Sequence, residues 1–277
     1  MRKLLSANFT RLWRNKVFWL CVLFSVGAAV VAAVGAHRVI VQHPGIEITL
    51  ESNLFQIAAM VGFAQAVFCG LFLGTEYSDG TVRNKLVVGH TRAAVYGANL
   101  IVCMAAGLVM SLAYFVVYLP LGWALIGAPT TAAKPLTGLI VLTLLMTLSF
   151  SAVFTLIGMV NQNKAGAAVT ALLLVLATMF LCSYLLAQLN EQETTMAGQM
   201  LSDGTVVLAD PEPNPDYVSG TKRAIYQFIV DFLPIGQGMQ ISNAEVTNPW
   251  RMGIYSAVIV VLSALLGTAS FRRKDIK

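Results

Sequence analysis

The sequence predicts an all-α polytopic membrane protein with six transmembrane helices, an amphipathic helix at the N-terminus and a short helix on the cytoplasmic side. Of its 277 residues, 57% are hydrophobic and 11% are charged, whereas ordinary soluble domains have about 25% charged residues. The charges are also segregated, and they leave uncharged stretches of about 20 residues, the length with which a helix crosses a bilayer. A soluble domain could not cover so large an apolar surface, so we expect burial in lipid.

Residues 1–16 precede the first apolar stretch and are predicted to form an amphipathic helix. Apolar residues recur on one helical face, at Leu5, Phe9 and Leu12. Basic residues lie on the opposite face, at Lys3, Arg11 and Arg14. This pattern suits a helix that lies along the inner headgroup layer, and a flexible basic anchor is the alternative. A cleaved signal peptide is not expected, because the apolar run that follows is longer than the roughly 7–15 residues of a secretory signal.

Six apolar stretches are predicted to span the membrane, at residues 17–36, 54–74, 98–119, 136–160, 166–188 and 252–270. None contains Asp, Glu, Lys or Arg, each of which would cost about 2.5–3.5 kcal/mol at the bilayer centre. The third stretch belongs to an uncharged region, 93–128, in which Pro120 is expected to end the helix; one long helix followed by a re-entrant turn is the alternative. Gly70, Gly74 and Gly27 are expected to allow close contact between helices.

The basic residues predict the orientation. With an even number of spans, both termini share one side with the 75–97 and 161–165 loops. That side holds most of the 18 basic residues, namely Arg2, Lys3, Arg11, Arg14, Lys16, Arg83, Lys85, Arg92, Lys164, Arg272, Arg273, Lys274 and Lys277. The positive-inside rule therefore places both termini in the cytoplasm, and we expect a multi-pass protein of the plasma membrane of a bacterium. The net charge of +5 is then a signal of orientation, and no nucleic-acid partner is expected.

Residues 189–250 form the largest segment outside the predicted spans, and the orientation makes them an extracytoplasmic loop. The part from Asp203 to Asp216 is rich in Asp, Pro and Gly and is expected to be loop. Apolar residues regain helical spacing from Ala224 to Leu233, which predicts a short external helix before the last span. A surface loop with a few buried anchors is the alternative.

The sequence lacks the usual motifs of catalysis. It contains no Gly-x-x-x-x-Gly-Lys-Ser/Thr, no His-Glu-x-x-His and no Gly-x-Ser-x-Gly, so nucleotide hydrolysis, zinc proteolysis and serine hydrolysis are not expected. His37, His43 and His90 lie in predicted loops on opposite sides, which argues against a shared metal site. The four cysteines lie one per span, where a thiol is usually a packing residue. We therefore expect no catalytic residue, no metal site and no cofactor bound by this chain itself.

Residues 75–92 form the most distinctive cytoplasmic segment. It is predicted to contain a capped helix of about nine residues, roughly 13 Å long, under the bilayer. Asp79 is expected to cap its N-terminus, and Gly89 suits a left-handed exit at its end. Thr91 is expected to cap the third span. A helix with one apolar and one basic face is suited to docking a partner, and an ordinary connector between spans is the alternative.

The run Gly-Thr-Glu-Tyr-x-x-Gly-Thr-x-Arg-x-x-Leu, from Gly74 to Leu86, follows the second span and precedes Arg92. In this setting it resembles the permease subunits of ABC-2 type (type V) ABC transporters. Other features agree along the chain, namely the amphipathic N-terminal helix, the six spans, Leu233-Pro234 before the last span and the terminal Phe271–Ile276. The chain departs from the pattern at Val88-Gly89-His90, where many members have a proline before the Ser/Thr-Arg pair, so the subfamily and the substrate stay open.

The resemblance implies a half-transporter whose energy comes from another protein. Two permease subunits, as a homodimer or a heterodimer within membrane lipid, would pair with two cytoplasmic ABC ATPase subunits that bind ATP and magnesium. The 76–89 segment would be the coupling helix that docks on the ATPase. The residues implied to couple the two proteins are Glu76, Tyr77, Gly80, Thr81, Arg83 and Leu86. Glu76 and Arg83 are the strongest candidates, because each can form charge-assisted hydrogen bonds across an interface. Substituting them is expected to uncouple transport without unfolding the membrane domain.

Two functions from other classes stay open at this point. An ion-coupled secondary transporter usually carries acidic or histidine groups within its spans, and none lies in the six stretches. A non-transporting scaffold or sensor subunit would have the same composition. The substrate is open too: a peptide, a drug, a lipid or an ion, with export as the direction that the family implies.

Overall fold

The computed structural model describes residues 1–161, 163–195, 198–200, 206–208 and 212–274. Six helical stretches in it are long and apolar enough to cross a membrane. They are α2 (Lys16–Gln42), α3 with α4 (Glu51–Leu54 and Gln56–Ser78), α6 (Arg92–Leu125), α7 (Ala133–Val160), α8 (Lys164–Asn190) and α11 (Pro249–Arg273). The all-α architecture with six spans is therefore confirmed. Each helix extends past the uncharged stretch predicted for it, at one end or both.

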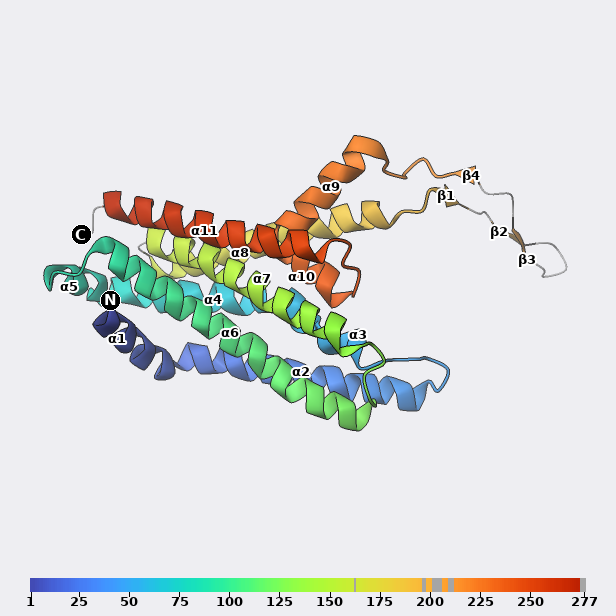
Figure 1. The fold of residues 1–277 in the computed structure, drawn as a ribbon, viewed down its shortest axis with the longest axis horizontal. Coiled ribbons are helices and arrows are strands. Elements are labelled where there is room, and N and C mark those ends of the chain that lie inside the picture. The colour runs from blue at the N-terminus through green and yellow to red at the C-terminus, as the bar shows by residue number, and fades with distance from the viewer. Residues whose placement is uncertain (162, 196–197, 201–205, 209–211, 275–277) are drawn as a thin grey trace.

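The long helices run side by side and define two ends of a bundle (Figure 1). Both termini and the short helices α1 (Arg2–Trp13) and α5 (Thr81–Val87) lie at one end, which we call the termini end. The segment between α8 and α11 emerges at the opposite end, which we call the loop end. The most buried span is α4, which packs against α8, α7 and α2, while α7 also packs against α11 and α6.

Helix α1 forms as predicted but buries a different stripe. Its inward residues are Leu4, Asn8 and Leu12, which are spaced four apart and therefore lie on one side of the helix. Leu5 and Phe9 are only partly buried. The helix packs against α6, a contact that the predicted position along the headgroup layer did not include. A polar residue belongs to the stripe because the Asn8 side chain bonds within the bundle.

The expectation that Pro120 ends the third span is wrong. Helix α6 has 34 residues, with Pro120 inside it. A proline removes one backbone hydrogen bond, and contacts on both sides of it hold this helix in place. Before it, the Tyr118 hydroxyl donates to the Leu50 carbonyl at 2.9 Å. After it, a Cβ at Gly122 would lie 3.6 Å from the Leu50 side chain. Tertiary packing therefore overrides the local tendency of proline to end the helix.

The predicted cytoplasmic helix is divided between two elements. Helix α4 continues through Ser78, so Glu76 and Tyr77 belong to its last turn. Only Thr81–Val87 form the separate helix α5. The extension of α4 has a physical cause, because the side chains of Glu76 and Tyr77 both find polar partners inside the bundle.

The caps of this segment agree with the prediction in part. Gly80, with φ of +66°, precedes α5, and no side chain caps the helix, so the prediction for Asp79 is wrong. Asp79 instead directly follows the last residue of α4. Gly89 adopts a left-handed φ of +96°, and Thr91 accepts a hydrogen bond from the Ala94 backbone at 3.2 Å, as predicted.

The loop end carries two further helices and four short strands. Helix α9 (Gly220–Phe232) covers most of the stretch predicted to be helical, and α10 (Pro234–Ser242) follows at once. The strands pair antiparallel, β1 (Thr194–Thr195) with β4 (Glu212–Pro213) and β2 (Gly198–Met200) with β3 (Val206–Leu208). Part of the loop expected from Asp203 to Asp216 lies outside the described residues.

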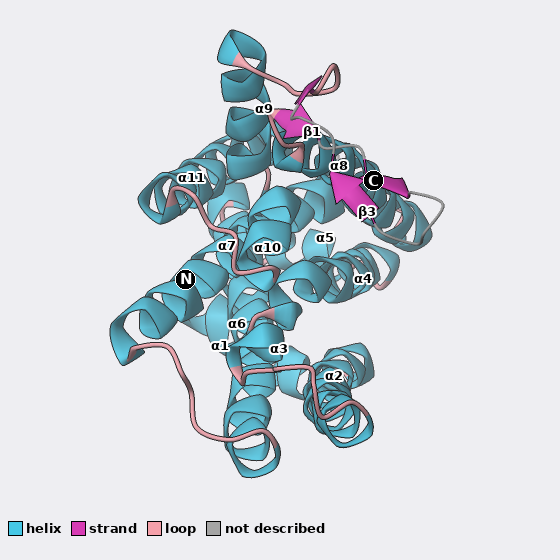
Figure 2. Cartoon of the chain, turned by 90° about the vertical axis from the view of Figure 1, so that its right-hand side faces the viewer, coloured by secondary structure: helices cyan, strands magenta, loops and turns pink. Residues whose placement is uncertain are grey.

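Helix α10 is an inner element rather than part of an external loop. Seen from the loop end, it lies among the long helices (Figure 2), and it packs against α4, α7 and α8. A Cβ at Gly238 would lie 2.4 Å from the Ala58 carbonyl of α4, so the two backbones are in direct contact. The Gln237 amide donates to the Met252 carbonyl of α11 at 3.2 Å and accepts from the Ser256 hydroxyl at 2.7 Å.

Close contact between α4 and α8 depends on two glycines. A Cβ at Gly70 would lie 2.5 Å from Ala168 Cα, and one at Gly74 would lie 2.5 Å from Lys164 Cα. Both residues therefore have the predicted packing role. Gly27 does not, because no atom lies within 4 Å of the position that its Cβ would take.

We expect Gly70→Ala to destabilise the protein, because the new methyl group would overlap the α8 backbone and overpacking typically costs about 1–3 kcal/mol. Gly27→Ala is the matched control, since open space surrounds that position. Thermal unfolding in detergent micelles should show a lower melting temperature for Gly70→Ala only. If the two variants melt alike, the α4–α8 contact is not as close as described.

Candidate functional site

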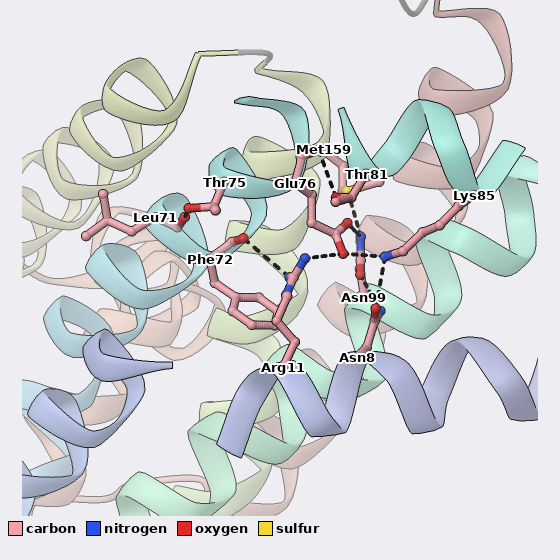
Figure 3. A network of polar contacts seen from close by, with 10 residues as sticks. All are labelled: Asn8, Arg11, Leu71, Phe72, Thr75, Glu76, Thr81, Lys85, Asn99 and Met159. Carbon is pink, nitrogen blue, oxygen red and sulfur yellow. Dashed lines mark hydrogen bonds and ion pairs between the residues drawn. The ribbon is translucent and has the colours of Figure 1, made fainter. Parts of the chain in front are cut away.

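A buried polar site lies at the termini end, around the carboxylate of Glu76 (Figure 3). Glu76 is completely buried in the last turn of α4. Its Oε1 atom forms ion pairs with Arg11 of α1 and Lys85 of α5. Its Oε2 atom accepts a hydrogen bond of 2.6 Å from the Asn99 amide of α6. One carboxylate thus joins four helices, α1, α4, α5 and α6.

Asn8 closes these contacts into a ring. The Lys85 ammonium donates to Asn8 Oδ1 at 2.9 Å, and Asn8 Nδ2 donates to Asn99 Oδ1 at 2.6 Å. The ring therefore runs from Glu76 through Asn99, Asn8 and Lys85 back to Glu76, and we call it the Glu76 ring. Each of the four side chains comes from a different helix. A buried polar network with its members bonded in this way fixes the relative positions of the elements that contribute to it.

The two cations of the site have different surroundings. The Arg11 guanidinium lies 3.8 Å from the centroid of the Phe72 ring and donates to the Phe72 carbonyl at 3.4 Å. Burial lowers the pKa of the Lys85 ammonium, and the neighbouring Glu76 carboxylate opposes that shift. Among the described residues, the ion pairs are these two, and both end on Glu76. The site holds two cations and one carboxylate, so it keeps a net positive charge.

The structure brings together only some of the predicted site residues. Their positions differ: Glu76 is buried, Tyr77, Gly80, Thr81 and Leu86 are partly buried, and Arg83 is exposed. The Tyr77 hydroxyl donates to the Met159 carbonyl at 2.6 Å, and the Thr81 hydroxyl donates to the Glu76 carbonyl at 3.0 Å. The interpretation of Glu76 as an interface contact is therefore corrected, because its carboxylate is used within this chain and has no exposed surface.

Several residues of the site were missed from the sequence. Arg11 was placed on the outward basic face of α1, and Asn8, Lys85 and Asn99 were not assigned to the site. A polar residue at Asn8, between Leu4 and Leu12 on one side of a helix, was the available signal. The adjacent Val87 and Val88 were also missed, although each is 78% exposed at the end of α5.

The described residues offer little for metal chemistry. They contain no group of three His, Cys, Asp or Glu residues that could hold a metal ion. The four cysteines are buried as thiols in four different helices, as expected for packing residues. The contacts that the site does show are ion pairs and hydrogen bonds that hold four helices together.

Comparison with known protein families assigns the chain. The model of a family described as ABC-2 family transporter protein matches residues 4–183. The chain belongs to the ABC-2 transporter family. The match runs from α1 into α8 and includes every residue of the Glu76 ring. No curated protein matches the chain. As an ABC-2 protein, it is a multi-pass permease component of an ABC transporter, a context that includes an ATPase partner.

The burial of Glu76 changes what its substitution should do in this ABC-2 permease. Glu76→Gln would leave Arg11 and Lys85 facing each other without a counter-charge. Breaking a buried pair typically costs about 3–5 kcal/mol, and the partial exposure of both cations favours the lower value. We therefore expect a lower melting temperature and faster amide exchange in α5. If the Glu76 ring does not hold α5 in place, amide exchange in α5 should be the same in Glu76→Gln as in the parent.

Asp79→Asn is the matched control for this substitution, because it removes a carboxylate from the same segment at an exposed position. The double variant Glu76→Gln with Lys85→Met should recover part of the lost stability, because it removes one of the two uncompensated cations. Equal melting temperatures for Glu76→Gln, Asp79→Asn and the parent would contradict the assigned role of the ring.

Proposed function

We propose that this ABC-2 permease is the membrane subunit of an ABC exporter, forms the substrate pathway as a dimer and is driven by a separate cytoplasmic ATPase. Two copies of that ATPase would bind ATP and magnesium. The observation that carries the proposal is the position of α5, a short helix at the termini end that the Glu76 ring ties to three other helices. Membership of the ABC-2 family favours this function over an ion-coupled secondary transporter and over a scaffold.

The outward side of α5 is suited to docking on the ATPase. Val82 is buried and Lys85 points to Glu76, so this side of the helix faces the bundle. The opposite side presents Arg83, Val87 and Val88, which we call the docking face. It combines a cation with two apolar side chains. A cleft in the ATPase that buried the two valines would gain about 1.5–3 kcal/mol for each.

The Glu76 ring supplies a route from α5 into the spans. A displacement of α5 moves Lys85, and Lys85 is bonded both to Glu76 of α4 and to Asn8 of α1. Asn99 of α6 is bonded to both Glu76 and Asn8, so α6 is connected to the same ring. Because the ring is closed, α5 cannot shift without moving these helices or breaking a buried ion pair. This is the property that a coupling element between an ATPase and a permease requires.

The orientation is part of the proposal. Both termini and α5 lie at the same end of the bundle (Figure 1), and this end carries most of the basic residues. By the positive-inside rule it faces the cytoplasm of a bacterial cell. The loop end, with α9 and the strands, would then face outward.

Cysteine labelling tests this orientation. In a variant whose four buried cysteines are replaced, a cysteine at exposed Asn243 of the loop end should react with an impermeant thiol reagent in intact cells. One at exposed Ser78 of the termini end should react only after permeabilisation. The opposite labelling pattern would invert the proposed topology, and labelling of both in intact cells would contradict six spans.

Substitution of the docking face tests the coupling role. Val87→Asp with Val88→Asp should weaken binding of the ABC ATPase by at least tenfold, because the apolar contact is lost and two carboxylates are introduced. Arg83→Ala should have a smaller effect, since an exposed ion pair contributes about 0.2–1 kcal/mol. Affinity would be measured with the permease in nanodiscs and each purified ABC ATPase subunit of its host.

Val41→Asp is the matched control, because Val41 is 64% exposed near the loop end of α2 and lies far from α5. It should bind the ATPase as the parent does. Parental affinity in the double valine variant would rule out the docking face, and failure of every ABC ATPase to bind the parent would contradict the proposed function.

A further inference from the structure

The inner end of the last span is fastened to α6 by an arginine. Arg92 is the first residue of α6, and its Nη1 atom donates to the Phe271 carbonyl at 3.0 Å and also to the Lys274 carbonyl. These carbonyls belong to the end of α11, where helix geometry leaves the last four carbonyls without intrahelical partners. The bonds join the start of one span to the end of another.

A lysine makes the matching contact with α7. The Lys274 ammonium donates to the Met159 and Val160 carbonyls at 3.0 and 2.5 Å. These are the last two residues of α7, so the ammonium satisfies carbonyls that the helix itself cannot. The same ammonium lies 4.7 Å from the centroid of the Tyr77 ring, and the Tyr77 hydroxyl also donates to Met159.

The electrostatics of the helix ends favour both contacts. A cation at a helix N-terminus, as Arg92 is, meets the positive end of its own helix dipole. Here the guanidinium is directed to the C-terminal carbonyls of α11, which carry the negative end of another dipole. Lys274 meets the negative end of α7 in the same way. Neighbouring Arg272 and Arg273 are exposed, so a positive charge near this position is not enough to make the contact.

The outer half of α11 is bonded to α10. The Gln237 amide of α10 donates to the Met252 carbonyl and accepts from the Ser256 hydroxyl, both in the first turns of α11. A helix of this length spans roughly 37 Å. Helix α11 is thus fixed at one end to α6 and α7 and at the other end to the inner helix α10.

We propose that Arg92, Lys274 and Tyr77 form a clamp that makes α11 a rigid link between α5 and α10. Arg92 follows α5 by a few residues, so a displacement of α5 pulls the start of α6, and the clamp carries that displacement to α11 and from there to α10. The clamp itself is inferred from the hydrogen bonds of Arg92, Lys274 and Tyr77 described above. Its role in transmission rests on the proposed function and makes these three residues positioning residues for the transport cycle.

The clamp is tested on the chain alone, in lipid nanodiscs, by hydrogen–deuterium exchange. Lys274→Met should speed exchange in the last turn of α7 about tenfold or more, because a charge-assisted cap is lost. Arg92→Gln should do the same for the last turn of α11. Lys274→Arg, which retains the charge and the donors, should restore protection. Arg273→Met removes the same charge from an exposed neighbour and should exchange as the parent does.

Equal exchange in Lys274→Met and Arg273→Met would overturn the clamp. Transmission is tested next, in the complex with its ATPase. Addition of a non-hydrolysable ATP analogue should alter exchange in α10 of the parent and of Arg273→Met, but not of Lys274→Met or Arg92→Gln, while the ATPase stays bound in all four. An equal response of α10 in all four would refute transmission through α11. If no ATPase binds the parent, the proposed function and the transmission role fail together, and the clamp is still judged by the first measurement.

Discussion

A single buried carboxylate, that of Glu76, organises the termini end of this ABC-2 permease. Removing a carboxylate from water is unfavourable unless ion pairs and hydrogen bonds replace its hydration, and here the replacements come from three other helices. Arg11, Lys85 and Asn99 contribute them. Such a buried pair adds little net stability compared with apolar packing. Breaking it, however, leaves an uncompensated buried charge, which disfavours partly assembled arrangements of α1, α4, α5 and α6.

Two adjacent residues in the last turn of α4 contact two different groups of helices. Successive residues of an α-helix point about 100° apart, so Glu76 and Tyr77 face different neighbours. Glu76 binds the group made by α1, α5 and α6, whereas Tyr77 reaches the end of α7 beside Lys274. Side chains of this turn thus contact α6, α7 and the end of α11, while α8 and α10 contact the backbone of α4 at Gly70, Gly74 and Ala58.

The features predicted correctly from the sequence are those that depend on local pattern. Six spans follow from apolar length, close helix packing from Gly70 and Gly74, and the left-handed turn from Gly89. The predictions that were wrong concern features that depend on contacts between residues far apart in the sequence. Pro120 lies within a helix because Leu50 packs on both sides of it. Glu76 is buried because its partners lie on other helices, and nothing in the spacing of the sequence around Glu76 reveals them.

The burial of Glu76 also separates two tasks, binding of the partner and stiffness of the connection, that the family resemblance assigned to the same residues. An exposed ion pair contributes about 0.2–1 kcal/mol and is screened by salt, so charge alone would make a weak contact with an ATPase. The exposed Val87 and Val88 can provide the larger apolar term. The charged residues lie behind them, away from water and salt, where their attraction is stronger. Affinity for the partner would then reside in the docking face, and stiffness in the ring. A permease that relied on one set of residues for both would have to break its internal connections each time the partner shifted.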